Sequence, residues 1–201
     1  RAVGKFIQQS GGRGQYGHVV FDVAPAPKGA GIMFNNKIIG GAIPREYIKS
    51  VEEGVQEGAR NGALAGYPVT DVEVTLVDGS FHEVDSSDIA FRMAAKIGFD
   101  EGLKNGGSIL LEPIMDLEVE VPEKYMGDVI GDLNSRRVRI SAINDRHNLK
   151  VIRGFAPLSE MFGYSTTVRS LTQGRATHTM EPSFIHEVPR NISEKIVKKT
   201  I

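Results

Sequence analysis

The fold is decided near the N-terminus, where a glycine-rich turn leads directly into a strand: Gly12-Arg13-Gly14-Gln15-Tyr16-Gly17-His18-Val19-Val20-Phe21. Its glycine spacing matches a dinucleotide-binding loop, but that loop must open a helix whose amide groups meet the pyrophosphate. The residues from Val19 to Phe21 predict a strand instead. A kinase glycine loop does join two strands, yet the kinase catalytic motifs are absent from the sequence downstream. The run therefore predicts a glycine-rich hairpin.

Outward from this hairpin, the first half of the chain predicts a sheet with two helices. Alternating or β-branched apolar residues predict strands over residues 3–9, 19–24, 32–39 and 69–77. Apolar residues at helical spacing predict helices over residues 44–61 and 86–103. Pro44 stands where the first of these helices would begin, a position that suits proline.

The second half predicts a different order of elements. A glycine-rich stretch at residues 104–108 marks the boundary. Beyond it, strands are expected over residues 114–121, 137–143, 149–155 and 175–180, helices over residues 125–133 and 158–171, and a terminal helix over residues 192–201. The order β-α-β-β-α-β is that of ferredoxin-like domains. We therefore predict a two-domain α+β protein, divided into residues 1–109 and 110–188.

Composition excludes several classes of site. The 201 residues include no cysteine, which removes disulfides, thiolate zinc sites and cysteine nucleophiles. No apolar run approaches the roughly 18 residues needed to span a bilayer. With 24 basic and 25 acidic side chains the formal charge is −1, so the chain lacks the basic excess of a general nucleic-acid binder.

The densest group of ionisable residues lies at a strand-to-helix junction, His82-Glu83-Val84-Asp85-Ser86-Ser87-Asp88. One histidine with scattered carboxylates matches no dedicated metal cage. Helix capping explains Asp85 and Asp88 better, with Asp85 as the N-cap. A small metal- or acid/base-dependent hydrolase centred on His82, Glu83 and Asp85 stays open as an alternative.

Two basic stretches could contact phosphate. Arg136-Arg137-Val138-Arg139 follows a predicted helix, where it is equally well explained as a solvated C-terminal turn. Arg169-Ser170-Leu171-Thr172-Gln173-Gly174-Arg175 is richer in hydrogen-bond donors and suits a phosphate or base-edge contact slightly better.

Five stretches together resemble the elongation factor G family of translation factors, in the order that the family has them. They are Ser10-Gly11-Gly12-Arg13-Gly14-Gln15-Tyr16-Gly17-His18-Val19, Phe81-His82-Glu83-Val84-Asp85-Ser86-Ser87, Leu111-Glu112-Pro113-Ile114-Met115, Gly127-Asp128-Val129-Ile130-Gly131-Asp132-Leu133 and Leu158-Ser159-Glu160-Met161-Phe162-Gly163-Tyr164. The resemblance covers nearly the whole chain. It implies the fourth and fifth domains of the factor, cut from a longer protein.

The resemblance implies a fold for each domain. Residues 1–109 would form the fourth domain, an α/β-sandwich-like fold with a mostly antiparallel sheet and two helices. Residues 110–188 would form a ferredoxin-like fifth domain. The terminal helix, residues 189–201, would pack back on the fourth domain.

The resemblance also implies where RNA is contacted. A tip would meet the small-subunit decoding centre, with its A-site tRNA and mRNA, through Gly11, Gly12, Arg13, Gly14, Gln15, Tyr16, Gly17, His18 and His82. His82 matches the position at which the eukaryotic counterpart carries a modified histidine. The sarcin–ricin loop of the large subunit would be contacted by Arg169, Ser170 and Gln173.

The implied function is to promote translocation of tRNA and mRNA on the ribosome during elongation. A ribosome-recycling paralogue would share these motifs and is the alternative within translation. We expect no catalytic residue, cofactor or metal in this chain, with GTP bound and hydrolysed elsewhere in the intact protein. We further expect a monomer that is cytoplasmic, or mitochondrial if the factor is organellar, and no membrane partner.

Overall fold

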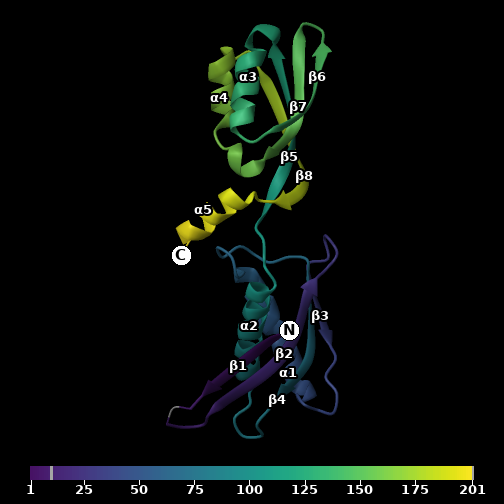
Figure 1. The fold of residues 1–201 in the computed structure, drawn as a ribbon, viewed down its shortest axis with the longest axis vertical. Helices are drawn as coiled ribbons and strands as arrows, with labels where there is room; N and C mark the ends of the chain where they lie inside the picture. Colours follow the sequence, from purple (N-terminus) through teal and green to yellow (C-terminus); the bar gives the residue numbers. More distant parts are fainter. Residues whose placement is uncertain (10, 201) are drawn as a thin grey trace. The chain divides into compact units, whose positions relative to one another are not determined.

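The computed structural model describes residues 1–9 and 11–200. They form two compact units (Figure 1). The first contains Arg1–Ile109 together with the chain from Asn191 onward, and the second is Leu110–Arg190. Within the described residues, no helix is long and apolar enough to cross a membrane. The α+β fold class is confirmed, and each unit has its own sheet and its own core.

The first unit is a four-stranded sheet with two helices packed on it. Its strands, in the order in which they pair, are β1 (Ala2–Gln8), β2 (Gln15–Pro25), β4 (Val72–Ser80) and β3 (Ile32–Asn36). The β3–β4 pair is parallel and the other two pairs are antiparallel, so the sheet is mostly antiparallel. The helices are α1 (Arg45–Asn61) and α2 (Asp88–Asn105).

The core of this unit follows from the period of each element. Val19 and Phe21 alternate along β2, as Val74 and Leu76 do along β4, and all four are fully buried. Each such side chain contributes about 1.5–3 kcal/mol when it leaves water. The helices complete the core with Val51, Val55, Phe91 and Phe99.

Two glycines let α2 approach the sheet closely. A Cβ on Gly4 would lie 1.9 Å from the carbonyl oxygen of Ala94, and one on Gly17 would lie 2.4 Å from that of Ala90. No real Cβ tolerates these distances, so the helix lies directly on β1 and β2 because these positions have no side chain. The start of α2 is thereby placed beside the β1–β2 turn.

The second unit has the predicted ferredoxin-like order. Its elements are β5 (Leu111–Pro122), α3 (Glu123–Ser135), β6 (Arg139–Arg146), β7 (Leu149–Pro157), a 3₁₀ turn η1 (Leu158–Glu160), α4 (Tyr164–Thr172) and β8 (Thr177–Glu187). The strands pair in the order β6-β7-β5-β8, and every pair is antiparallel. Buried residues of β5, α3 and α4 form the core, among them Leu117, Val119, Leu133, Tyr164 and Val168.

Several element boundaries differ from the sequence prediction. The helix expected from residue 158 begins at Tyr164, because Gly163 takes a left-handed conformation (φ 74°) between it and η1. Strand β8 continues to Glu187 because it pairs with β5 from Glu120 as far as Leu111, the first residue of β5. The terminal helix α5 (Arg190–Thr200) has no buried residue within its described length, and its packing on the first unit stays a prediction.

Candidate functional site

Two loops far apart in the sequence meet at one end of the first sheet. Because β2 and β4 are antiparallel neighbours, the start of β2 lies beside the end of β4, with His18 opposite Ser80 (Figure 1). The β1–β2 turn and the loop from β4 to α2 therefore share this end. We call residues 11–18 and 81–87 the tip. Ser10, which belongs to the first tip motif, lies outside the described residues.

Hydrogen bonds join the two tip loops. The amide of Tyr16 donates to the carbonyl of Asp85 (2.8 Å), and the hydroxyl of Ser86 donates to the carbonyl of Tyr16 (2.9 Å). The same hydroxyl accepts from the amide of His82 (2.9 Å). Arg13 Nε donates to the carbonyl of Val84 (2.9 Å). Ser86 is only 4% exposed, so its hydroxyl is a buried junction between the loops.

The ring of His82 is stacked on the ring of Tyr16. Their centroids are 4.2 Å apart and their planes differ by 24°. The His82 side chain is nevertheless 59% exposed, and its Nδ1 lies 3.9 Å from Oδ2 of Asp85. The stack therefore holds an imidazole that a partner can reach.

The expected tip residues differ in how accessible they are. Gly11, Gly12, Arg13 and His82 are exposed, whereas Gly14, Gln15, Tyr16 and His18 are half-buried. Gly17 is buried against α2, so its structural role is to admit the helix.

The expected cap of α2 is wrong. Ser87, in extended conformation, is the N-cap, and its hydroxyl accepts from the amide of Ala90 (3.2 Å). Asp85 lies two residues too early, and its carbonyl bonds to the hairpin. Asp88 instead accepts from Ser50 Oγ (2.6 Å), which ties α2 to α1.

The surroundings of His82 bear on the hydrolase alternative. Within the described residues, no group of three or more histidine, aspartate or glutamate side chains is placed to hold a metal ion. The carboxylate near the imidazole is that of Asp85, and Glu83 is exposed.

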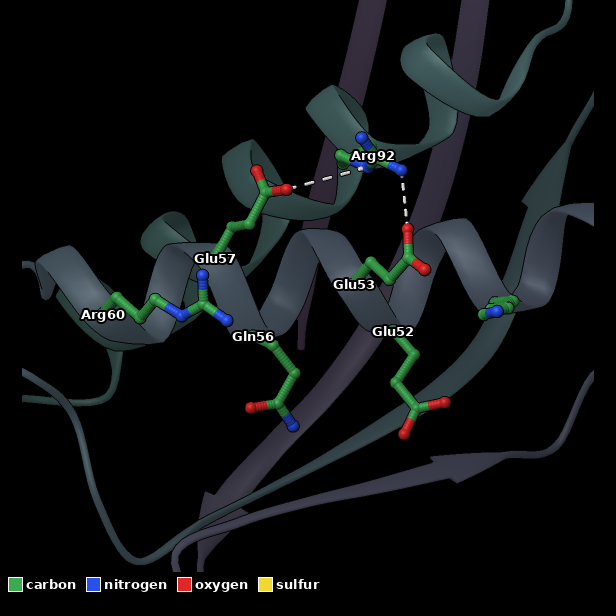
Figure 2. Close-up of a pocket in the computed structure, with 7 residues that line it drawn as sticks. Glu52, Glu53, Gln56, Glu57, Arg60 and Arg92 are labelled. Carbon is green, nitrogen blue, oxygen red and sulfur yellow. Dashed lines mark hydrogen bonds and ion pairs between the residues drawn. The ribbon is translucent and has the colours of Figure 1, made fainter.

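A surface pocket of about 490 Å³ lies along α1, apart from the tip residues. Figure 2 shows Arg92 of α2 between Glu53 and Glu57. A terminal guanidinium nitrogen of Arg92 lies 2.6 Å from Oε2 of Glu53, and its Nε lies 3.8 Å from Oε1 of Glu57. The other lining residues are Lys49, Glu52, Gln56 and Arg60. The ion pairs of Arg92 with Glu53 and Glu57 form a charged contact between α2 and α1, which was not predicted from the sequence.

In the second unit, the three residues expected to contact large-subunit RNA lie together at the end of α4. Arg169, Ser170 and Gln173 are all exposed. Gln173 is the C-cap in left-handed conformation (φ 52°), and its backbone N–H donates to the carbonyl of Arg169. The helix end thus presents these side chains on one short segment.

The arginines after α3 have internal partners. Arg136 donates to Asp132 (2.9 Å), to the carbonyl of Glu160 (2.7 Å) and to Thr167 (3.1 Å). Arg137 binds both carboxylate oxygens of Glu112 at 2.9 Å and Glu160 at 2.8 Å. The guanidinium groups of Arg136 and Arg137 bind within the second unit, so neither the solvated turn nor phosphate contact describes these two residues, whereas Arg139 is exposed.

Two half-buried histidines make stability depend on pH. Burial lowers the pKa of His18 and of His178, and Lys5 and Arg169 respectively add to the effect. Between the lowered folded pKa and the ordinary 6.5, the unfolded chain binds more protons, so stability is lost as pH falls through this window. We expect the urea concentration at the unfolding midpoint to decrease as the pH is lowered from about 7.5 to 5.5. In the double variant His18→Gln/His178→Gln that fall should largely disappear, and an unchanged fall would contradict the assignment.

Comparisons with known proteins agree for both units. Residues 1–107 match the family model for elongation factor G, domain IV, and residues 109–196 match the model for the elongation factor G C-terminus. A crystal structure of a protein from Thermus thermophilus is similar over 98% of this chain, with 39% identity and a TM-score of 0.81. The chain spans 30% of the length of that protein.

Proposed function

Because the chain belongs to the elongation factor G family, we propose that it is the ribosome-contacting C-terminal module of a translational GTPase that promotes translocation of tRNA and mRNA. Its two domains are those of a translation elongation factor, a class of protein whose partner is the ribosome. GTP is bound and hydrolysed in the intact factor, outside this chain.

The observation that carries the proposal is the tip of the first unit, whose two loops are joined by hydrogen bonds and present exposed residues. RNA in single strands and at helix ends is recognised by stacking on aromatic rings and by hydrogen bonds to base edges and backbone. The exposed His82 ring and the Arg13 guanidinium offer both kinds of contact. The glycines at residues 11–14 let backbone amides approach the RNA. The tip would enter the decoding centre and oppose backward movement, a role that needs no bond chemistry.

The end of α4 supplies a second contact. Arg169, Ser170 and Gln173 are exposed together and offer a cation, a hydroxyl and an amide. Such groups bind phosphate and sugar oxygens. We assign them to the sarcin–ricin loop of large-subunit rRNA.

Replacing His82 with alanine in the intact factor tests the proposal. We expect translocation, measured by stopped flow, to slow about tenfold, the effect of losing about 1.4 kcal/mol of stacking and hydrogen bonding. Ribosome-stimulated GTP hydrolysis should stay near the wild-type rate, because the variant leaves the GTPase domain intact. His186→Ala, an exposed histidine of the second unit, is the matched control. An unchanged translocation rate in the His82 variant would remove the role given to the tip.

The same preparation distinguishes translocation from recycling. A translocase supports poly-phenylalanine synthesis. A factor that splits ribosomal subunits with a recycling factor but supports no synthesis would identify the recycling paralogue instead.

A further inference from the structure

We propose that Tyr16, anchored by Ser80, is a positioning residue that fixes the orientation of the His82 ring. This inference rests on the proposed function, because it assigns Tyr16 an action through His82 where the sequence had predicted direct RNA contact.

The stack alone gives the imidazole a preferred plane. The two rings lie 4.2 Å apart and within 24° of parallel, a geometry in which offset-stacked rings attract one another. The Asp85 carboxylate, at 3.9 Å, is too distant for a direct hydrogen bond that would orient the ring. Tyr16 is therefore the side chain that most constrains the exposed His82.

Ser80 in turn fixes the ring of Tyr16. Its hydroxyl lies 2.7 Å from the Tyr16 hydroxyl and 2.8 Å from Nδ1 of His18. A serine hydroxyl has one proton and can accept as well as donate. The Ser80 hydroxyl therefore bridges Tyr16 and His18: where it donates to Nδ1 of His18 its oxygen accepts from Tyr16, and where Nδ1 carries the proton it accepts from His18 and donates to Tyr16. With either direction the Tyr16 hydroxyl stays tied to Ser80.

The backbone of Tyr16 is held by the opposite loop. Its amide donates to Asp85, and its carbonyl accepts from the buried Ser86 hydroxyl, which also accepts from the His82 amide. The backbones of Tyr16 and His82 are thus both hydrogen-bonded to Ser86. Because the two backbones are held together, the position of the Tyr16 ring determines the position of the His82 ring stacked on it.

NMR of the 201-residue chain tests the stack without the ribosome. The imidazole protons of His82 should lie upfield of those of the exposed His147, because a stacked tyrosine ring shields them. Tyr16→Leu should abolish the upfield shift. Tyr16→Phe and Ser80→Ala both remove the hydrogen bond between the Tyr16 and Ser80 hydroxyls, so each should reduce the shift without abolishing it. Unshifted His82 signals in the wild-type chain would overturn the inference.

Translocation by the intact factor tests the consequence. We expect Tyr16→Leu to slow translocation severalfold, up to about tenfold, and Tyr16→Phe to stay within about twofold of wild type. The double variant Tyr16→Leu/His82→Ala should be no slower than His82→Ala, because residues that act as a unit are not additive. Tyr67→Leu, an exposed tyrosine outside the tip, is the matched control.

The outcomes separate this inference from the proposed function. Additive losses in the double variant, or a normal rate for Tyr16→Leu beside a slow His82→Ala, would overturn the positioning role and leave the proposed function standing. A normal rate for His82→Ala would overturn the proposed function, and with it the functional consequence drawn here, whatever the NMR signals show.

Discussion

Replacing Arg137 with methionine is expected to destabilise the second unit by about 2–3 kcal/mol. The guanidinium binds both oxygens of Glu112, a residue only 7% exposed, and also binds Glu160. Methionine keeps much of the side-chain volume but leaves the Glu112 carboxylate without its cation. Breaking a buried pair costs about 3–5 kcal/mol, and the 24% exposure of the Arg137 side chain places this one at or below the low end.

Urea unfolding, monitored by hydrogen exchange of backbone amides in β5 and β7, measures the loss of stability in the second unit. Arg175→Met is the control, because Arg175 is exposed and follows the end of α4. The free energy of unfolding of this control should stay within about 0.5 kcal/mol of wild type. Equal stability of the Arg137 and Arg175 variants would show that the bidentate pair does not hold the domain together.

The second large effect is expected in the first unit, where Gly4→Ala should cost about 3 kcal/mol or more. The new methyl carbon would lie 1.9 Å from the Ala94 carbonyl oxygen and 2.6 Å from the Gly98 amide nitrogen. Both are backbone atoms, so no side-chain rotation relieves the contact. The helix α2 must move off the sheet, which also loosens the packing beneath the tip.

Gly127→Ala is the matched control for this substitution. Gly127 is exposed in α3, and a Cβ there meets no heavy atom within 4 Å. That variant should be stabilised by about 0.5–1 kcal/mol, because alanine favours the helix. Chemical denaturation of both variants compares them directly, and a stable Gly4→Ala protein would contradict the close approach of α2.

Much of the fold is visible in the sequence because local period determines it. Alternation along residues 69–77 and helical spacing along residues 86–103 are properties of each segment alone. Both elements form, as β4 (Val72–Ser80) and α2 (Asp88–Asn105), each with its bounds shifted by two or three residues. Ends of elements are less predictable, because β8 extends as far as its partner β5 allows.

Contacts between distant segments cannot be predicted in the same way. Arg137 was expected in a solvated turn or against phosphate, because its partners Glu112 and Glu160 are 25 and 23 residues away. The cap of α2 was misplaced by two residues, since Asp85 and Ser87 suit that role equally by type. The sequence identified His82 as a residue that capping leaves unexplained, but its stack on Tyr16 depends on the pairing of β2 with β4.

Directed hydroxyl-radical probing tests most directly the claim that the tip meets small-subunit RNA. The chain has no cysteine, so Val84→Cys, at a position 67% exposed on the tip, can carry an iron chelate in an intact factor freed of other cysteines. Ala30→Cys is the control, because this exposed residue precedes β3 at the end of the sheet far from Ser80. With the factor on the ribosome, we expect cleavage of small-subunit rRNA around the decoding centre from Val84→Cys and none there from Ala30→Cys. Identical cleavage from both positions, or none from Val84→Cys, would contradict it.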